Sequence, residues 1–357
     1  MTRCRNNNRN DTEQETTIVG KFADKKGATM TTGISRRGFL GGAAGVSALS
    51  GMTFAGVKPA HAAFPERAIT VIVPYGPGGG SDITARLLAK DLEPIVGKSV
   101  TVENRAGGGG WVGWGSLAAS KPDGYTVGYI AIPNLYAGYL DRSLAGGSRK
   151  ENLESFTPLI NHVFDYNLWG VRKESKFQTL KEVIEEAKRR PGELSANGGG
   201  HGTDDHIAIL AIEAATGAKI NLAHFRSTAE GKTQVLGGHL DILAANISEV
   251  AEDVRSGQVR VLGVMAPERS KFMPQAPTFR EQGFDQVWAV SRGIAGPAGL
   301  PKDVEEALIA FLDKTISSPE HREKAERLSL EPRVVKGAEY RKFLKDSEQA
   351  TKRLMKW

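Results

Sequence analysis

The chain has 357 residues, a formal net charge of +6 and one cysteine, Cys4. Residues 1–63 hold nine of the 47 basic and four of the 41 acidic residues, so the rest is nearly neutral, with 38 basic and 37 acidic residues. This balance gives no support for nucleic-acid binding. A single cysteine also excludes an intrachain disulfide.

The N-terminal segment has the pattern of an export signal. The stretch "SRRGFL" contains the paired residues Arg36 and Arg37, and a weakly apolar run rich in glycine and alanine follows it. A small-x-small pattern then ends at Ala62, so we predict a Tat-type signal over 1–62 that is cut after this residue. A transmembrane anchor is the alternative, but the run is too short and too rich in glycine to favour it. Met30 would start a signal of ordinary length, which leaves 1–29 as an N-terminal extension.

Strands and helices alternate through the rest of the chain. Apolar runs predict strands at Ile69–Pro74, Ser99–Glu103, Tyr125–Ile130, Leu159–Phe164, Leu168–Val171, Leu194–Ala196, Ile220–Phe225, Leu240–Ala244, Val259–Met265 and Trp288–Ile294. Helical spacing or capping predicts helices at 81–93, Thr179–Arg190, His206–Thr216, 228–236 and 248–256, with two more at the C-terminal end. A further helix of small residues follows the glycines at Gly107–Gly110 and ends near Ser120. This alternation favours a doubly wound α/β architecture with mostly parallel sheets. About 295 residues without the signal exceed one ordinary domain, which predicts two lobes.

Two glycine-rich loops each join a strand to a helix, at Gly76–Asp82 and at Gly198–Thr203. A tight turn with simple helix capping explains either loop alone. No Lys follows the first loop as a Walker A motif requires, and Ser81 stands where a dinucleotide fingerprint needs its third glycine. Amides at a helix start lack intrahelical partners and bind anions. If the two loops face each other across a cleft, they could hold a small molecule with a negative group at each end.

The sequence contains no recognisable set of catalytic or metal-binding residues. His201 and His206 are five residues apart, which does not fit the i, i+4 face of helical metal pairs. His162, His224 and His239 are interpreted as structural histidines, and Asp204 and Asp205 as charges of a first helical turn. No G-x-S-x-G elbow accompanies a histidine and an aspartate in the required order. We therefore expect no enzyme activity, no metal and no cofactor.

Several stretches together resemble one family of receptors. They include "FPERAITVIVPYGPGGGSDITARLLA", "VTVENRAGGGGWVG", "KPDGYTVGYI", "GGGHGTDDHIAI" and "LGGHLDILAANISEV". The chain from the first of these onward is similar to the extracytoplasmic receptors of tripartite tricarboxylate transporters, the TctC or Bug family. The resemblance implies a two-lobed periplasmic binding-protein fold of the type II kind, with a ligand cleft between the lobes. It also implies a small carboxylate ligand and integral membrane transporter subunits as partners.

The resemblance also implies which residues bind the ligand. The family's ligand loops correspond to Tyr75, Gly78, Gly79, Gly80, Ser81 and Asp82 in the first lobe, and to Gly200, Gly202, Thr203 and Asn246 in the second. Ser81 and Thr203 would add hydroxyl donors, whereas Asp82 would fix its loop by capping.

The expected lobes are 63–164 with 287–357, and 165–286. The chain would cross between them near residues 164 and 286, and the hinged lobes would close on the ligand. The ligand would be a di- or tricarboxylate, an acidic amino acid or an aromatic acid, bound by a monomer in the periplasm. A carboxylate receptor for a sensor kinase and, less favoured, an exported hydrolase are the alternatives.

Overall fold

The computed structural model describes residues 64–141 and 150–355. Arg36, Arg37 and Ala62 of the predicted export signal lie outside the described residues. Among the helices of the described part, none has the length and apolar character needed to cross a membrane.

Ten strands and ten α-helices are described. The strands are β1 Ile69–Val73, β2 Val100–Asn104, β3 Thr126–Ile132, β4 Phe156–Arg172, β5 Ser195–Gly198, β6 Asn221–His224, β7 Leu243–Asn246, β8 Val259–Val264, β9 Ala289–Pro297 and β10 Glu331–Lys336. The α-helices are α3 Gly80–Val96, α4 Trp111–Ala118, α5 Asn134–Leu140, α6 Leu180–Arg189, α7 Asp204–Thr216, α8 Thr228–Leu236, α9 Ile247–Arg255, α10 Lys302–Ile316, α11 Pro319–Arg327 and α12 Gly337–Met355.

One sheet has the strand order β10-β4-β9-β3-β1-β2. Its apolar side chains pack against α3 and α10 through residues such as Leu88 and Leu312. A second group of apolar side chains packs against α4, α5 and α12 and includes the buried residues Trp111 and Trp114. This sheet is therefore covered by helices on both faces, as an α/β layer arrangement requires.

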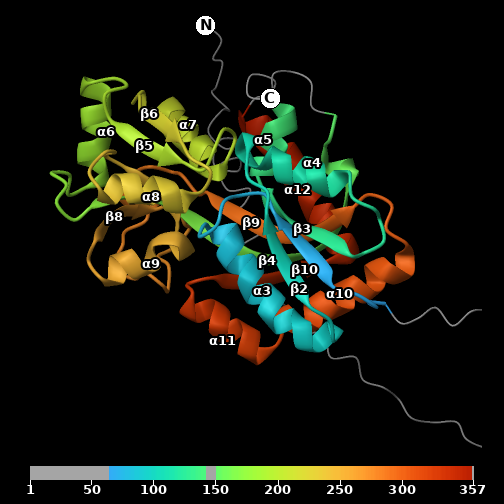
Figure 1. Ribbon diagram of the computed structural model, residues 1–357. Coiled ribbons are helices and arrows are strands. Elements are labelled where there is room, and N and C mark those ends of the chain that lie inside the picture. The colour runs from blue at the N-terminus through green and yellow to red at the C-terminus, as the bar shows by residue number, and fades with distance from the viewer. Residues whose placement is uncertain (1–63, 142–149, 356–357) are drawn as a thin grey trace, which may run out of the picture.

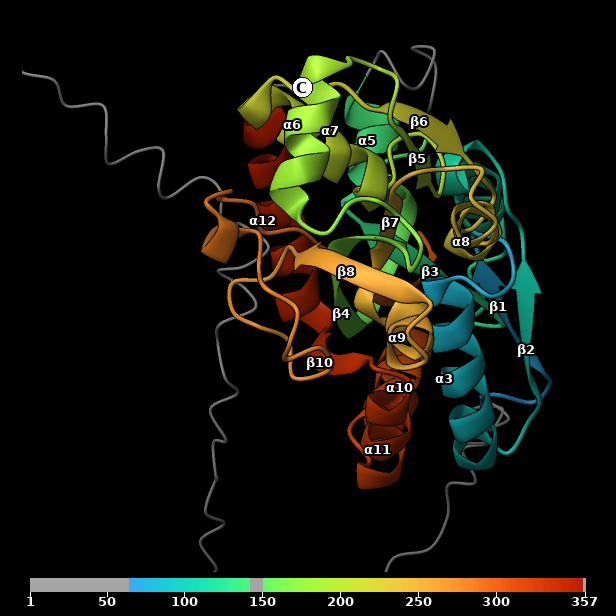
Figure 2. The same cartoon turned by 90° about the vertical axis from the view of Figure 1, so that its left-hand side faces the viewer.

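The second half of β4 leaves this sheet and pairs with β7 and β8. The short parallel pair of β5 and β6 lies beside it, linked by an isolated bridge between Ala196 and Ile242. Helices α6 and α7 contribute to one core of this region, and α9 to another. Figure 1 shows the elements from α6 to β8 on the left and those around α3, β1 to β3 and α10 on the right; Figure 2 shows the molecule from the side.

The expectation of mostly parallel sheets is wrong. Only β1 with β2, β1 with β3, and β5 with β6 pair in parallel, whereas the pairings of β4 and β9 with their neighbours are antiparallel. The physical reason is the chain path. The chain leaves the first sheet along β4 and returns along β9, so these two neighbouring strands must run in opposite directions.

The strands predicted at Leu159–Phe164 and Leu168–Val171 are one continuous strand, β4. The chain also ends with three helices and the strand β10, where two helices are predicted, and α5 lies where the sequence predicts only a loop. The proposed lobe boundary at 164 falls inside β4, and the one at 286 falls shortly before β9. Division into these two residue ranges stays a proposal.

Candidate ligand-binding site

Three helices begin beside the smaller of two cavities: α3 at Gly80, α7 at Asp204 and α9 at Ile247. The cavity volume is about 30 Å³, which is room for roughly two water molecules. Its lining includes Tyr75, Gly79, Gly80, Ser81, Asn134, Thr203, Asp204, Asp205, Asn246, Glu249 and Arg292. The elements before β4 and the elements after it both contribute, so the cavity lies where the two expected lobes meet.

The first glycine loop is fixed by Asp82. Gly78 has a φ of +79°, a conformation that suits glycine, and its N–H donates to Oδ2 of Asp82 over 3.0 Å. Arg86 and Asn104 also donate to this carboxylate. Burial raises the pKa of Asp82, but these hydrogen bonds outweigh burial and hold the pKa below its usual value. Asp82 thus stays charged and holds the loop, as predicted, instead of facing the cavity.

Glu249 places a carboxylate at the start of α3. Its Oε1 accepts the N–H of Gly80 over 2.8 Å, and its Oε2 accepts the N–H of Asn246 over 2.9 Å. The same carboxylate lies 3.9 Å from Nη2 of Arg292. Burial raises the pKa of Glu249, although Arg292 and the two backbone donors oppose the shift. Two helix N-termini and a guanidinium therefore hold one carboxylate between them.

Arg292 extends from β9 into the cavity and is 3% exposed. Its Nη1 donates to Oδ2 of Asp165 over 2.6 Å, and its Nη2 donates to Oδ1 of Asn246 over 2.8 Å. Its Nε has no hydrogen-bond partner among the described residues. A Cβ on Gly80 would lie 2.2 Å from Nη2, so only glycine leaves room for this guanidinium.

The second glycine loop makes hydrogen bonds mainly within itself. The hydroxyl of Thr203 donates to the carbonyl oxygen of Gly200 over 2.9 Å. The N–H of Gly202 donates to Nδ1 of His206 over 3.1 Å. Gly200 and Gly202 have φ values of +126° and +74°, which explains why glycines occupy these positions. The hydroxyl of Thr203 is thus engaged by its own loop.

Two buried carboxylates follow this loop at the start of α7. Asp204 accepts hydrogen bonds from the side-chain amides of Asn134, Asn167 and Asn246. Burial raises the pKa of Asp205 well above its usual value, and the neighbouring carboxylates of Asp204 and Glu249 add to the shift. The cavity lining therefore carries three carboxyl groups and the guanidinium of Arg292.

A larger cavity of about 410 Å³ adjoins the first and shares Tyr75 and Gly199 with it. Its other lining residues are Gly107, Gly108, Gly109, Gly110, Gly200, His201, His224, Phe225, Arg226 and Glu230. Gly109 packs closely against the second glycine loop. A Cβ on Gly109 would lie 2.2 Å from the carbonyl oxygen of His201, and a Cβ on Gly200 would lie 2.9 Å from Cα of Gly109. The N–H of Gly76 also donates to the carbonyl oxygen of Arg226 over 3.0 Å.

The predicted site residues do not all reach the smaller cavity. Tyr75, Gly79, Gly80, Ser81, Thr203 and Asn246 line it, Gly200 lines only the larger cavity, and Gly78, Asp82 and Gly202 line neither. The sequence reasoning did not include Glu249 or Arg292. A single arginine within the otherwise uncharged run "WAVSRGIAGPAG" was the available signal for Arg292.

A polar cavity between two α/β regions, joined by two antiparallel crossing strands, defines a periplasmic binding-protein fold. Comparison with solved structures agrees, since BugD, a periplasmic binding protein, superposes with a TM-score of 0.73 at 25% identity and covers 82% of this chain and 98% of BugD. A Rhodopseudomonas palustris protein solved with adipate, Rpa4515, has a TM-score of 0.73 at 24% identity over 82% of this chain and 96% of its own.

The sequence comparisons identify the family. Residues 84–357 match the model of the tripartite tricarboxylate transporter family receptor, TctC. The protein BugT of Bordetella pertussis is 33% identical over 255 residues, which are 71% of this chain and 76% of BugT. This chain belongs to the TctC family of receptors. The family consists of binding proteins and not enzymes, which sets aside the exported hydrolase.

Proposed function

We propose that this protein is a periplasmic receptor that binds a small carboxylate in the smaller cavity and delivers it to the membrane subunits of a tripartite transporter. One observation carries the proposal: the N–H groups of Gly80 and Asn246 already hold the carboxylate of Glu249, with Arg292 beside it. A ligand carboxylate offers the same chemistry as this side chain. The adipate in Rpa4515 is also a carboxylate.

The charges in the cavity favour one kind of carboxylate. Asp204, Asp205 and Glu249 line it together with one guanidinium, that of Arg292, so a dianionic ligand would meet an acidic lining there. A ligand that carries an ammonium group beside its carboxylate avoids this cost. Its carboxylate would replace Glu249 at Gly80, and its ammonium group would lie near Asp204 or Asp205. Among the expected ligand classes, we therefore propose an acidic amino acid.

Ligand entry requires the loops to separate. A volume of about 30 Å³ holds water but no organic acid. The contacts that would open include those between Gly80 and Glu249, between Asn134 and Asp204, and between Arg292 and Asn246. The contacts of Gly76 with Arg226 and of Gly109 with His201 would open with them, as in a hinge motion around a ligand.

Calorimetry with matched ligand pairs tests the proposal. Succinate is compared with aspartate, and glutarate with glutamate, because each pair differs only in the ammonium group. We expect each amino acid to bind at least about tenfold more tightly, a difference of about 1.4 kcal/mol. Tighter binding of the dicarboxylates would contradict the role of the ammonium group. If neither these acids nor adipate nor an aromatic acid bound, the carboxylate receptor itself would be refuted.

A further inference from the structure

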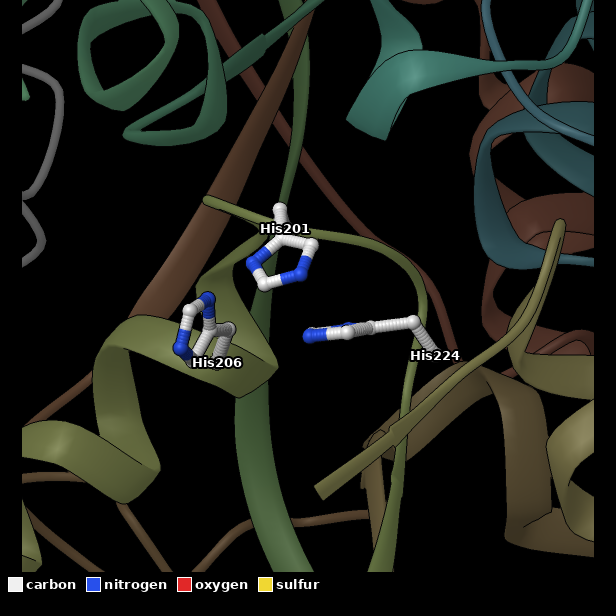
Figure 3. A group of neighbouring side chains, drawn as sticks. All are labelled: His201, His206 and His224. Carbon is white, nitrogen blue, oxygen red and sulfur yellow. The ribbon is translucent and has the colours of Figure 1, made fainter. Parts of the chain in front are cut away.

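Three histidines from separate segments meet at the edge of the larger cavity. His201 lies in the second glycine loop, His206 in the first turn of α7 and His224 at the end of β6. One ring nitrogen of each lies within 4.8 Å of one nitrogen of both others. The ring centroids of His201 and His224 are 3.8 Å apart, and the other two pairs are 5.4 and 5.2 Å apart. Figure 3 shows the three rings around a common space.

The fold explains why the sequence spacing did not reveal this group. His201 precedes α7, so the i, i+4 rule for two histidines on one helix does not apply to it. Strands β5 and β6 are parallel, and Gly198 pairs with His224 at their carboxyl ends. The loop that follows β5 therefore passes directly beside His224 and brings His201 and His206 to it.

One of these rings has a ring nitrogen available for coordination, since a metal ligand must be an unprotonated nitrogen. Nδ1 of His224 is buried and has no hydrogen-bond partner among the described residues.

We propose that His201, His206 and His224 bind one divalent transition ion of the zinc type. Imidazole nitrogens suit Zn²⁺, Cu²⁺ and Ni²⁺, whereas Ca²⁺ and Mg²⁺ require oxygen ligands. Three protein nitrogens leave a fourth position open. His201 and His224 line the larger cavity, so this position faces it and takes a water.

Binding requires a small movement of the loop. A tetrahedral Zn²⁺ with Zn–N distances of about 2.0–2.1 Å holds its nitrogens about 3.4 Å apart, so the rings must approach one another by roughly an ångström. His201 is exposed and lies between Gly200 and Gly202, two glycines with positive φ. The N–H of Gly202, which donates to Nδ1 of His206, turns away when this ring binds the ion.

Zinc titration tests the site directly. The full chain is used without a polyhistidine tag and with Cys4→Ser, so that neither tag nor thiol binds metal, and it is first treated with a chelator. We expect one Zn²⁺ per chain by calorimetry. Each of the variants His201→Ala, His206→Ala and His224→Ala should weaken binding at least about tenfold. His239→Ala is the matched control, because His239 is exposed and outside the group, and it should bind like wild type.

A second readout separates loss of ligand from loss of fold. Co²⁺ bound by three imidazoles in a four-coordinate site absorbs visible light strongly, and this absorption should disappear in His201→Gln, the variant of the most exposed ring. Thermal unfolding without metal should be the same for His201→Gln and wild type. The proposal is overturned if wild type binds no stoichiometric Zn²⁺, or if the three variants bind it as tightly as wild type does.

Discussion

Gly80 and Glu249 are 169 residues apart in the chain, and the N–H of Gly80 donates to Oε1 of Glu249 over 2.8 Å. The bond joins the start of α3 to the first turn of α9 at the wall of the smaller cavity. A hydrogen bond to a charged group contributes about 1.5–3 kcal/mol. A ligand carboxylate that takes this place must therefore replace a bond of the same kind, so closure of the protein and ligand binding depend on the same donors.

Gly80→Ala should weaken carboxylate binding at least about tenfold, as loss of one charged hydrogen bond predicts. The new Cβ would lie 2.2 Å from Nη2 of Arg292 and displace the guanidinium from Asn246. Gly79→Ala is the matched control, since its Cβ meets Ser227 at an ordinary 3.5 Å and its φ is −79°. Calorimetry measures both, and equal affinities of the two variants would contradict the site.

Arg292→Gln should lower the free energy of unfolding by about 3–5 kcal/mol, because the buried carboxylates of Asp165 and Glu249 lose their cation. Arg67→Gln is the control: Arg67 pairs with Asp123 on the surface, where such a pair contributes about 0–1 kcal/mol. Urea denaturation measures both variants. Similar small losses in the two would show that Arg292 does not balance the buried acids.

Gly109→Ala should hinder the approach of the second glycine loop to the segment Gly107–Gly110 on closure. Its Cβ would lie 2.2 Å from the carbonyl oxygen of His201, and the φ of +67° is unfavourable for alanine. Gly115→Ala is the control, because its Cβ would meet nothing within 4 Å. Small-angle scattering with ligand should give a larger radius of gyration for Gly109→Ala than for Gly115→Ala. An identical decrease on ligand addition in both variants would argue against this contact as part of closure.

Acidification should destabilise the protein through its histidines. The pKa values of His206 and His224 are lowered to about 4 in the folded protein, against about 6.5 in an unfolded chain. Their contribution to stability is therefore complete above pH 6.5 and is lost as the pH falls toward 4. Asp205 and Glu249, whose pKa values are raised, act in the opposite direction.

Comparison of variants isolates the effect of these histidines. The double variant His206→Asn/His224→Asn is compared with wild type in the presence of a chelator. When the pH is lowered from 7.5 to 5, the melting temperature of the double variant should fall less than that of wild type. Scanning calorimetry measures both proteins in the same buffers. Parallel pH profiles would show that the two rings do not account for the acid sensitivity.

Changing Arg36 and Arg37 to lysine should leave the precursor in the cytoplasm, because the Tat route depends on the arginine pair. Cell fractionation and immunoblotting follow the uncut and cut forms. A variant with a single lysine, Arg36→Lys, shows whether one arginine suffices. Normal processing of the double variant would rule out this export route.

Much of the site could be predicted from short stretches of sequence. The glycine loops, their helix starts and the capping role of Asp82 depend on residues close together in the chain. Six of the ten predicted ligand residues line the smaller cavity, and all but Tyr75 of these lie at helix starts. Within this loop the structure requires glycine at Gly80 more than at Gly79, since a Cβ on Gly80 would meet Arg292 whereas one on Gly79 meets Ser227 at an ordinary distance.

The division of β4 shows where sequence patterns mislead. Asp165 and Asn167 interrupt its apolar residues and suggest a loop between two strands. In the structure both are buried with partners from distant segments, Arg292 for Asp165 and Asp204 for Asn167. A buried polar side chain costs little when it is hydrogen-bonded. No local pattern can show partners that are so far away along the chain.

The sequence by itself determined the α/β class, the family and the two glycine-rich helix starts, because these depend on local backbone chemistry and on stretches read in order. Only the tertiary structure decided the antiparallel crossing of β4 and β9, the position of Arg292 between Asp165 and Asn246, and the meeting of His224 with His201 and His206. Each of these features joins residues from separate elements. Their energies depend on distance and burial, which arise only when the sheets and helices pack.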